Sequence, residues 1–306
     1  SAADRDLELS FDRALGTDQR APRTFDSLDD RLTALASAEQ GRIGVAAIDL
    51  SSGRSVAILG EQPFPMASTS KIAIVATFLE GVDQGRYRLD QQFPMMIPLP
   101  SAKFDGPIAP VRAGHKLAAI DLIEATITRS DNQATDALLA AIGGPAAVNR
   151  WLKRAGIEGM RIDRDIATLV RDDGEIDPAR SVDVRDSATP LAMAELLSGL
   201  YRGQWLSGSS RAVLIGAMER CLTGKRRIPG QLPEGTLVAH KTGTLNNTSS
   251  DVGIIHTPDG RALAVAIYVT GQGGKPAREQ RIASIARAIF DGYQADQAAT
   301  VRTVAR

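Results

Sequence analysis

Strand-like patterns lie at both ends of this sequence, and helix-like patterns fill the long stretch between them. Apolar runs and alternation predict strands at residues 41–50, 55–59, 237–240, 250–256 and 263–269. Apolar residues at helical spacing predict helices at residues 28–36, 69–83, 118–129, 132–142, 145–155, 190–202, 208–221 and 276–292. A chain of this kind leaves a sheet, builds a helical lobe and returns to the sheet to complete it.

The composition excludes several classes of protein. With 306 residues, of which 43% are hydrophobic, the chain has enough apolar material for one large domain or two closely associated subdomains. Lysine plus arginine and aspartate plus glutamate both number 36, so no net charge would attract nucleic acid or anionic lipid. Aromatic residues, at 4%, offer few platforms for base stacking. No apolar run approaches the roughly 18 residues that a membrane span needs.

Cysteine and histidine are too sparse for other kinds of site. Cys221 is the single cysteine, which excludes an intramolecular disulfide and a cysteine-based metal site. The histidines, His115, His240 and His256, lie far apart and form no H-x-x-x-H pair, so we expect no zinc site. The first residues, SAADRD, contain no apolar segment typical of signal peptides. We therefore expect either a protein that is not exported or one whose signal peptide has been removed.

Ser68 and Lys71 form an S-x-x-K pattern at the expected start of an apolar helix. Residues three apart lie on one helix face, with about 5–6 Å between their Cβ atoms, so the lysine can hydrogen-bond the serine hydroxyl. If burial lowers the pKa of the lysine, it can also remove the hydroxyl proton. Taken alone, the pattern is more typical of an ordinary serine cap followed by a solvated lysine.

Two further motifs follow along the chain. Ser130-Asp131-Asn132 lies in a predicted loop between helices, where on its own it would be a helix cap. Lys241-Thr242-Gly243-Thr244 follows the predicted strand at residues 237–240, where on its own it would be the end of an edge strand. In the order S-x-x-K, S-D-N and K-T-G, at a helix start, a loop and a strand, the three motifs resemble the active-site triplet of class A β-lactamases and penicillin-binding proteins.

The resemblance extends over roughly residues 24–294. Residues 161–164 and 185–194 are similar to the two ends of the class A omega loop, and residues 223–235 to the approach to the K-T-G strand. The resemblance implies an α/β (α+β) fold of the serine β-lactamase and penicillin-binding-protein kind, with helices flanking an antiparallel sheet and an added all-helical lobe. The implied parts are an N-terminal arm (1–23), a discontinuous α/β subdomain (24–60 and 226–294), an all-helical subdomain (61–225) with a long omega loop (161–186), and a C-terminal tail (295–306).

The resemblance also implies a role for each matched residue. Ser68 corresponds to the acylated nucleophile, Lys71 to the lysine that helps activate it, and Ser130 to the hydroxyl that passes a proton to the leaving nitrogen. The residues expected to bind substrate are Asn132, at the acylamide, and Arg227, Lys241, Thr242, Gly243 and Thr244, around the carboxylate. Backbone N–H groups of Ser68 and Thr244 would form the oxyanion hole, where one donor typically contributes ~10²–10³ in rate. Arg227 has an alternative role as a solvated residue of a basic run.

The omega loop is where the sequence departs from the family pattern. Class A enzymes hydrolyse their acyl-enzyme with a water held by an E-x-x-L-N motif, which this chain lacks. Counting forward from Arg161 places Ile166 at the glutamate position, whereas counting back from Arg185 places Asp173 there. The two counts differ because the loop is about seven residues longer than the usual pattern.

Three possibilities for hydrolysis follow from the longer loop. Asp173 can be the base, although its side chain is one methylene shorter than glutamate. Glu175 can take this role if Gly174 lets the loop follow a different path. Or neither acts, residues 166–170 pack over the site as an added apolar stretch, and the acidic residues 172–177 form a solvated loop tip.

These matches predict a serine β-lactamase that opens the ring amide through a Ser68 acyl-enzyme, an activity that confers antibiotic resistance. The alternative is a D,D-peptidase-like penicillin-binding protein, or a β-lactam-binding sensor module, that deacylates slowly. The expected partner is a small-molecule β-lactam, with no nucleic acid, membrane span, metal or organic cofactor, and a monomer is favoured. The resemblance implies a periplasmic or secreted location, with the signal peptide already removed.

Overall fold

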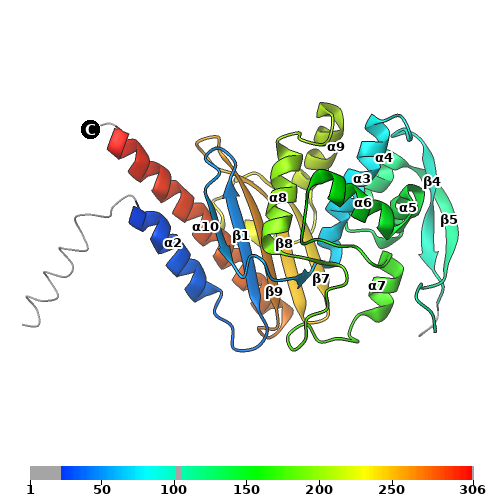
Figure 1. Ribbon diagram of the computed structural model, residues 1–306, viewed down its shortest axis with the longest axis horizontal. Coiled ribbons are helices and arrows are strands. Elements are labelled where there is room, and N and C mark those ends of the chain that lie inside the picture. Colours follow the sequence, from blue (N-terminus) through cyan, green and yellow to red (C-terminus); the bar gives the residue numbers. More distant parts are fainter. Residues whose placement is uncertain (1–21, 101–104, 305–306) are drawn as a thin grey trace, which may run out of the picture.

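A five-stranded antiparallel sheet in the order β2-β1-β9-β8-β7 lies at the centre of the computed structural model, which describes residues 22–100 and 105–304 (Figure 1). Its strands are β1 (Ile43–Asp49), β2 (Ser55–Ile58), β7 (Val238–Leu245), β8 (Thr248–His256) and β9 (Ala262–Thr270). The prediction that strands from both ends of the sequence join in one sheet is confirmed. The predicted α+β fold is confirmed with it.

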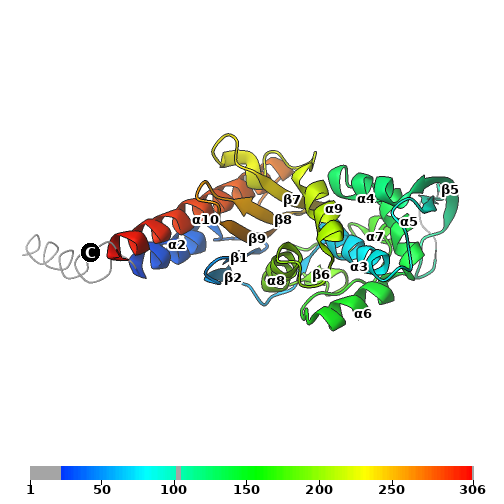
Figure 2. The same ribbon diagram turned by 90° about the horizontal axis from the view of Figure 1, so that it is seen from above.

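Helices cover both faces of the sheet. On one face, α10 (Lys275–Val304) packs on β8 and β9, and α2 (Pro22–Leu35) runs beside α10 (Figures 1 and 2). On the other face, α8 (Pro190–Tyr201) packs on β1 and β9. Because both faces are covered, β8 and β9 are buried almost throughout. The sequence of β9 is accordingly a near-continuous apolar run, whereas the first half of β8 is polar.

Successive residues of β9 contribute to two separate hydrophobic cores. Val265 and Ile267 pack in the core that contains α2 and α10. Ala266 and Tyr268 belong to the larger core, which extends into the helical part of the molecule. This division follows from the alternation of side chains along a strand, and it makes β9 the central support of the structure.

The middle of the chain forms a helical lobe next to the edge strand β7 (Figure 1). The remaining helices are α3 (Lys71–Asp83), α4 (Ala119–Thr128), α5 (Asn132–Ile142), α6 (Pro145–Ala155), α7 (Ile166–Asp172) and α9 (Gly208–Glu219), with 3-10 turns η1 (Ala67–Ser70) and η2 (Ile228–Gln231). The central one is α3, which packs against α4, α5, α6 and α9 and is buried over nearly its whole length. Because it is held on all sides, α3 is a rigid base for the residues at its start.

Two pairs of strands were not anticipated by the sequence patterns. β4 (Gln92–Pro98) and β5 (Val111–Ala118) form a hairpin whose residues are mostly half-buried or exposed, and β4 contains two prolines. Strands of that composition lack the apolar alternation on which strand prediction depends. The two-residue strands β3 (Phe64–Pro65) and β6 (Ser187–Ala188) also pair, and they join the chain before η1 to the end of the omega loop.

The C-terminal helix is longer than predicted. α10 continues to Val304, past the expected end near residue 292 and through most of the predicted tail at 295–306. No glycine or proline follows Gly292, and the alanines of this stretch favour helix. The predicted N-terminal arm lies outside the described residues except for its last two, which are in α2. Within residues 22–100 and 105–304, no helix is both long and apolar enough to cross a membrane.

Candidate active site

Ser68 lies on the 3-10 turn η1, directly before α3. The neighbouring hydroxyls of Thr69 and Ser70 are buried and donate to backbone carbonyls of the same region, at 2.8 and 3.0 Å. Ser68 is only partly buried. Of the three consecutive hydroxyls, Ser68 is therefore the accessible one, in agreement with its predicted role as nucleophile.

The turn η1 packs unusually closely against β7. A Cβ atom built on Gly243 would lie 2.6 Å from the carbonyl oxygen of Met66, too close for any other residue without a backbone shift. Ala67 adopts a φ of 49°, in the left-handed region that non-glycine residues seldom occupy. The glycine of the K-T-G motif thus lets the strand approach the turn, and this contact sets Ser68, the candidate nucleophile, beside β7.

Lys71 is fully buried, and its Nζ atom has three hydrogen-bond acceptors. Nζ donates to Ser130 O at 2.8 Å, to Ser130 Oγ at 2.9 Å and to Asn132 Oδ1 at 2.7 Å. Burial lowers the pKa of Lys71 well below its usual value, and the nearby charge of Lys241 lowers this pKa further. A lysine with a lowered pKa can exist as the free amine, which the predicted base role requires.

Ser130 lies in the short loop between α4 and α5, with a φ of 57°. Asp131 caps α5 by accepting the N–H of Ala134 at 2.9 Å, so the helix cap expected for this motif is formed by its aspartate. Ser130 Oγ also accepts from Lys241 Nζ at 3.0 Å. Its hydroxyl therefore lies between two lysines, and the strained backbone places it there.

Lys241 is buried within β7, the strand that lies against η1. Its Nζ donates to Thr242 O at 2.9 Å as well as to Ser130. Burial lowers the pKa of Lys241 to about 8, although the charges of Cys221 and Asp251 act in the opposite direction. At neutral pH most of this lysine is therefore charged and able to bind a carboxylate.

His240, one residue before the K-T-G motif, pairs with Asp251 on the neighbouring strand. Its Nδ1 lies 2.9 Å from both carboxylate oxygens of Asp251, and both residues are buried. Burial alone lowers the pKa of His240, but the charge and hydrogen bond of Asp251, with a contribution from Cys221, raise it to about 10. This charged pair supports β7 next to Lys241, and no sequence motif indicated it.

Arg227 is buried and contacts the motif residues directly. It donates from Nη2 to Thr244 Oγ1 at 2.6 Å and from Nη1 to Gly243 O at 2.8 Å, while Nε donates to Glu279 at 2.9 Å. Only 2% of its surface is exposed. The alternative of a solvated arginine is therefore wrong, and Arg227 holds the hydroxyl of Thr244 in place.

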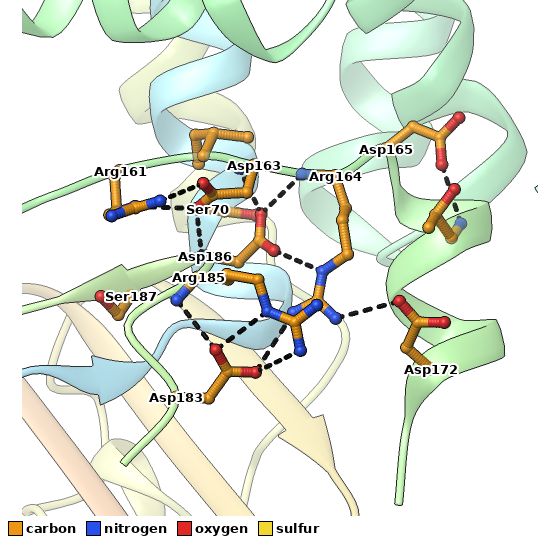
Figure 3. Close-up of polar contacts among 12 residues, drawn as sticks. Ser70, Arg161, Asp163, Arg164, Asp165, Asp172, Asp183, Arg185, Asp186 and Ser187 are labelled. Atoms are coloured by element: carbon orange, nitrogen blue, oxygen red, sulfur yellow. Dashed lines mark hydrogen bonds and ion pairs between the residues drawn. The ribbon is translucent and has the colours of Figure 1, made fainter. Parts of the chain in front are cut away.

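The two ends of the loop at residues 161–186 are tied together by charged hydrogen bonds (Figure 3). Arg164 Nε donates to Asp186 Oδ2 at 2.7 Å, and its Nη1 donates to Asp172 Oδ2 at 3.2 Å. Asp186 and Asp163 each accept backbone N–H groups from the other end of the loop. The side chains of Arg164, Asp172 and Asp186 are largely buried. Asp172 is therefore part of the ion-pair network that joins the two ends of the loop, and it is not part of a solvated loop tip.

Asp173 and Glu175 lie where the loop meets the turn between β7 and β8. Both oxygens of Asp173 accept the N–H of Asn246, at 3.0 and 3.2 Å. Asp173 and Glu175 line a small cavity, about 60 Å³ in volume, together with Ala67, the residue before Ser68. Both candidate carboxylates are exposed and share this cavity with the turn that carries Ser68, and their role as base stays a prediction.

Residues 166–170 belong to α7, a helix that sequence analysis did not assign. Ile166, Ala167 and Leu169 are buried, and α7 packs against α5. Asp136 of α5 accepts the N–H groups of Ile166 and Ala167 at 2.8 and 2.9 Å. Residues of this apolar stretch therefore pack against α5, while Val170 stays half exposed, and packing over the site stays a prediction. Sequence analysis missed Asp136, although its position one helical turn after Asn132 is a signal that could have identified it.

Comparison with known proteins identifies the family. A family model described as the beta-lactamase enzyme family matches residues 27–293. β-Lactamase CTX-M-25 of Escherichia coli is 32% identical over 270 residues, covering 87% of this chain and 89% of that protein. A β-lactamase of Proteus vulgaris is 30% identical over 250 residues, covering 81% of this chain and 89% of that protein.

Solved structures agree with this assignment. An ancestral class A β-lactamase matches with a TM-score of 0.74 at 36% identity, covering 86% of this chain and 99% of that one. A β-lactamase from Chitinophaga pinensis matches with a TM-score of 0.75 at 29% identity, covering 87% of this chain and 99% of that one. The chain therefore belongs to the beta-lactamase enzyme family, as a class A serine β-lactamase.

Proposed function

We propose that this β-lactamase hydrolyses the ring amide of β-lactams through an acyl-enzyme on Ser68. The observation that carries the proposal is the position of Ser130 Oγ, which accepts hydrogen bonds from both Lys71 and Lys241. A base for the nucleophile, a proton donor for the leaving nitrogen and a cation for the substrate carboxylate thus lie in one group. The β-lactamase names of the relatives favour this function over the D,D-peptidase and sensor alternatives.

Acylation uses this group in sequence. The free amine of Lys71 takes the hydroxyl proton of Ser68, and Ser68 Oγ forms a bond to the carbonyl carbon of the ring amide. The backbone N–H groups of Ser68 and Thr244 stabilise the negative oxygen that develops. When the carbon–nitrogen bond breaks, Ser130 passes its proton to the nitrogen and receives the proton held by Lys71.

Substrate is oriented by the two motifs around the nucleophile. Asn132 binds the acylamide, while Lys241, Thr242 and Thr244 bind the carboxylate next to the close approach at Gly243. Arg227 supports this subsite through its hydrogen bond to the Thr244 hydroxyl. Hydrolysis of the acyl-enzyme then requires a water activated by a loop carboxylate, for which Asp173 or Glu175 is the candidate.

The setting of the enzyme follows from the same family membership. We place it in the periplasm or outside the cell, the location that the resemblance to class A β-lactamases implies. It acts as a monomer on a small-molecule substrate, without nucleic acid. Its parts are the α/β subdomain of residues 24–60 and 226–294 and the helical subdomain of residues 61–225.

Turnover of nitrocefin combined with intact-mass measurement tests the proposed function. We expect many turnovers per enzyme and a transient mass increase equal to one β-lactam. One stable adduct without turnover would favour a penicillin-binding protein or sensor. A purified chain that forms no adduct at all would refute the proposed acyl-enzyme chemistry.

A further inference from the structure

Asp136 is a buried carboxylate that holds the start of α7. Only 5% of its surface is exposed. Its Oδ1 accepts the N–H of Ile166 at 2.8 Å, and its Oδ2 accepts the N–H of Ala167 at 2.9 Å. Asp165 accepts the next N–H, that of Thr168, at 2.8 Å. Three successive N–H groups of the loop helix are therefore bound by carboxylates, two of them by the same residue of a different helix.

The helix that carries Asp136 also contacts the proposed base. Asn132, one turn earlier on α5, accepts from Lys71 Nζ at 2.7 Å. Asn132 and Asp136 line one cavity of about 210 Å³, and Ile166 and Ala167 form its wall on the loop side. One side of α5 therefore faces both the base and the loop helix.

The charges around this cavity act on each other. Burial raises the pKa of Asp136 to about 6; the two backbone N–H groups and Lys71 act to lower it, and Asp165 acts to raise it. Burial and Lys241 lower the pKa of Lys71, and the carboxylates of Asp136 and Asp131 act to raise it. Lys71 and Asp136 thus each favour the charged form of the other. Among the described residues that line this cavity, the other charged one is Arg171.

We propose that Asp136 is a positioning residue that couples the omega loop to the acylation site, because one buried carboxylate both seats α7 and supports the ammonium form of Lys71. The inference rests on the proposed role of Lys71 as the base for Ser68. When Asp136 takes up a proton, the oxygen that carries it becomes a poorer acceptor for the N–H facing it, and the attraction to Lys71 is lost. The hydrogen bonds that hold the start of α7 and the protonation of Lys71 therefore change together.

The variant Asp136→Asn separates this coupling from simple packing. We expect the acid-side midpoint of the acylation rate, measured in single turnover with a fluorescent penicillin, to move to lower pH by about one unit because Lys71 loses a neighbouring anion. We also expect faster hydrogen exchange at the amides of Ile166 and Ala167. The matched control is Leu169→Ala, which loosens α7 by truncating a buried side chain and removes no charge. It should speed exchange in α7 and leave the midpoint unchanged.

Each readout can overturn the proposal. If the pH midpoint of acylation is unchanged in Asp136→Asn, Asp136 has a structural role only. If hydrogen exchange at Ile166 and Ala167 is unchanged, Asp136 does not hold the start of α7. If Asp136→Asn does not fold, the carboxyl carbon of Asp136 can be titrated by NMR in the wild type and in Lys71→Ala. We expect Lys71→Ala to raise that pKa above about 6, and an unchanged value overturns the coupling. Failure of the wild type to acylate would refute the proposed function. The hydrogen-exchange rates of α7 and the NMR titration of the Asp136 carboxyl would still test the role of Asp136 separately.

Discussion

Lys241 Nζ lies 3.0 Å from Ser130 Oγ, on an oxygen that also accepts from Lys71. A hydroxyl accepts at most two hydrogen bonds, and its single proton can then be donated only to a third partner. With both acceptor positions occupied by lysines, the proton of Ser130 is directed away from them. This arrangement suits a group that must deliver a proton to substrate, and it depends on both lysines being buried.

Ser68→Ala should abolish covalent labelling by a fluorescent penicillin, because no other hydroxyl of the turn is both accessible and next to Lys71. The matched control is Ser70→Ala, which removes a buried hydroxyl that donates to Ala67 O. We expect this control to keep its labelling and to lose about 1 kcal/mol of stability. Peptide mapping of the adduct checks both variants, and a label found on Ser70 would contradict the assignment.

Acylation should slow above pH 8 as Lys241 loses its charge. Burial lowers the pKa of Lys241 to about 8, so at pH 9 roughly a tenth of the lysine is charged. The second-order rate constant of acylation should therefore fall about tenfold between neutral pH and pH 9. A β-lactam whose carboxylate is esterified is the control, since its slower acylation should show no such decline. An equal decline for both substrates would show that another group titrates.

Asp173→Asn should trap the acyl-enzyme if Asp173 activates the hydrolytic water. Asparagine can still accept the N–H of Asn246, so the loop should keep its contact with the β7–β8 turn. Loss of a general base typically costs ~10²–10⁴ in rate, which makes the adduct long-lived enough for mass spectrometry while acylation stays fast.

Two other loop variants complete this test. Asp177→Asn alters a neighbouring carboxylate that accepts from Asn247 at 2.9 Å, and it should not trap the adduct. A trap in Glu175→Gln but not in Asp173→Asn would transfer the role to Glu175. Unchanged deacylation in both would remove the loop carboxylates from the mechanism.

Gly243→Ala should reduce activity by roughly a hundredfold, because the new methyl group forces β7 and η1 apart and displaces the reacting groups. A Cβ at this position would lie 2.6 Å from both Met66 O and Ser250 Oγ. Gly208→Ala is the control, since no atom lies within 4 Å of a Cβ there and its backbone is not left-handed. Nitrocefin kinetics and melting temperatures should separate the two, and full activity in Gly243→Ala would refute the argument.

The His240–Asp251 pair should make stability depend on pH. The pKa of His240 is about 10 in the folded protein, against ~6.5 when unfolded. The stabilisation is therefore complete below about pH 6.5 and is lost as pH rises toward 10. His240→Leu should lower the free energy of unfolding by about 3–5 kcal/mol at pH 7 by leaving Asp251 buried without its partner.

Urea titrations at pH 6, 8 and 10 measure this effect. The stability advantage of wild type over His240→Leu should shrink along the series. The lowered pKa values of Lys71 and Lys241 make both proteins gain stability over the same range, so only the difference between the two proteins reports on His240. An advantage that does not change with pH would show that His240 is not the group that titrates.

Much of the site could be predicted because three short motifs preserve both residue type and local geometry. Ser68 with Lys71, and Ser130 with Asn132, are close in sequence, so helix and loop spacing alone brings them together. The K-T-G motif could be placed because strand patterns at both ends of the chain predicted a single sheet. Burial of Arg227 was not predictable from its basic neighbours, because its acceptors lie on β7, β8 and α10.

The unpredicted contacts join positions that are distant along the chain. Asp136 binds backbone groups of Ile166 and Ala167, and backbone N–H groups are present in every sequence, so no residue type identifies the partner. His240 meets Asp251 only because β7 and β8 pair in a particular register. Periodicity indicates which side chains are buried, but it does not indicate which polar atoms meet inside.

Ser68 belongs to the first quarter of the sequence and Lys241 to the last. The strand that carries Lys241 is linked to β1 only through β9 and β8. A polypeptide emerging from the ribosome therefore exposes Ser68 and Lys71 long before it can supply Lys241. Until the final strands are added, the proposed nucleophile lacks the cation that is proposed to orient the substrate, so assembly of the site depends on completion of the sheet.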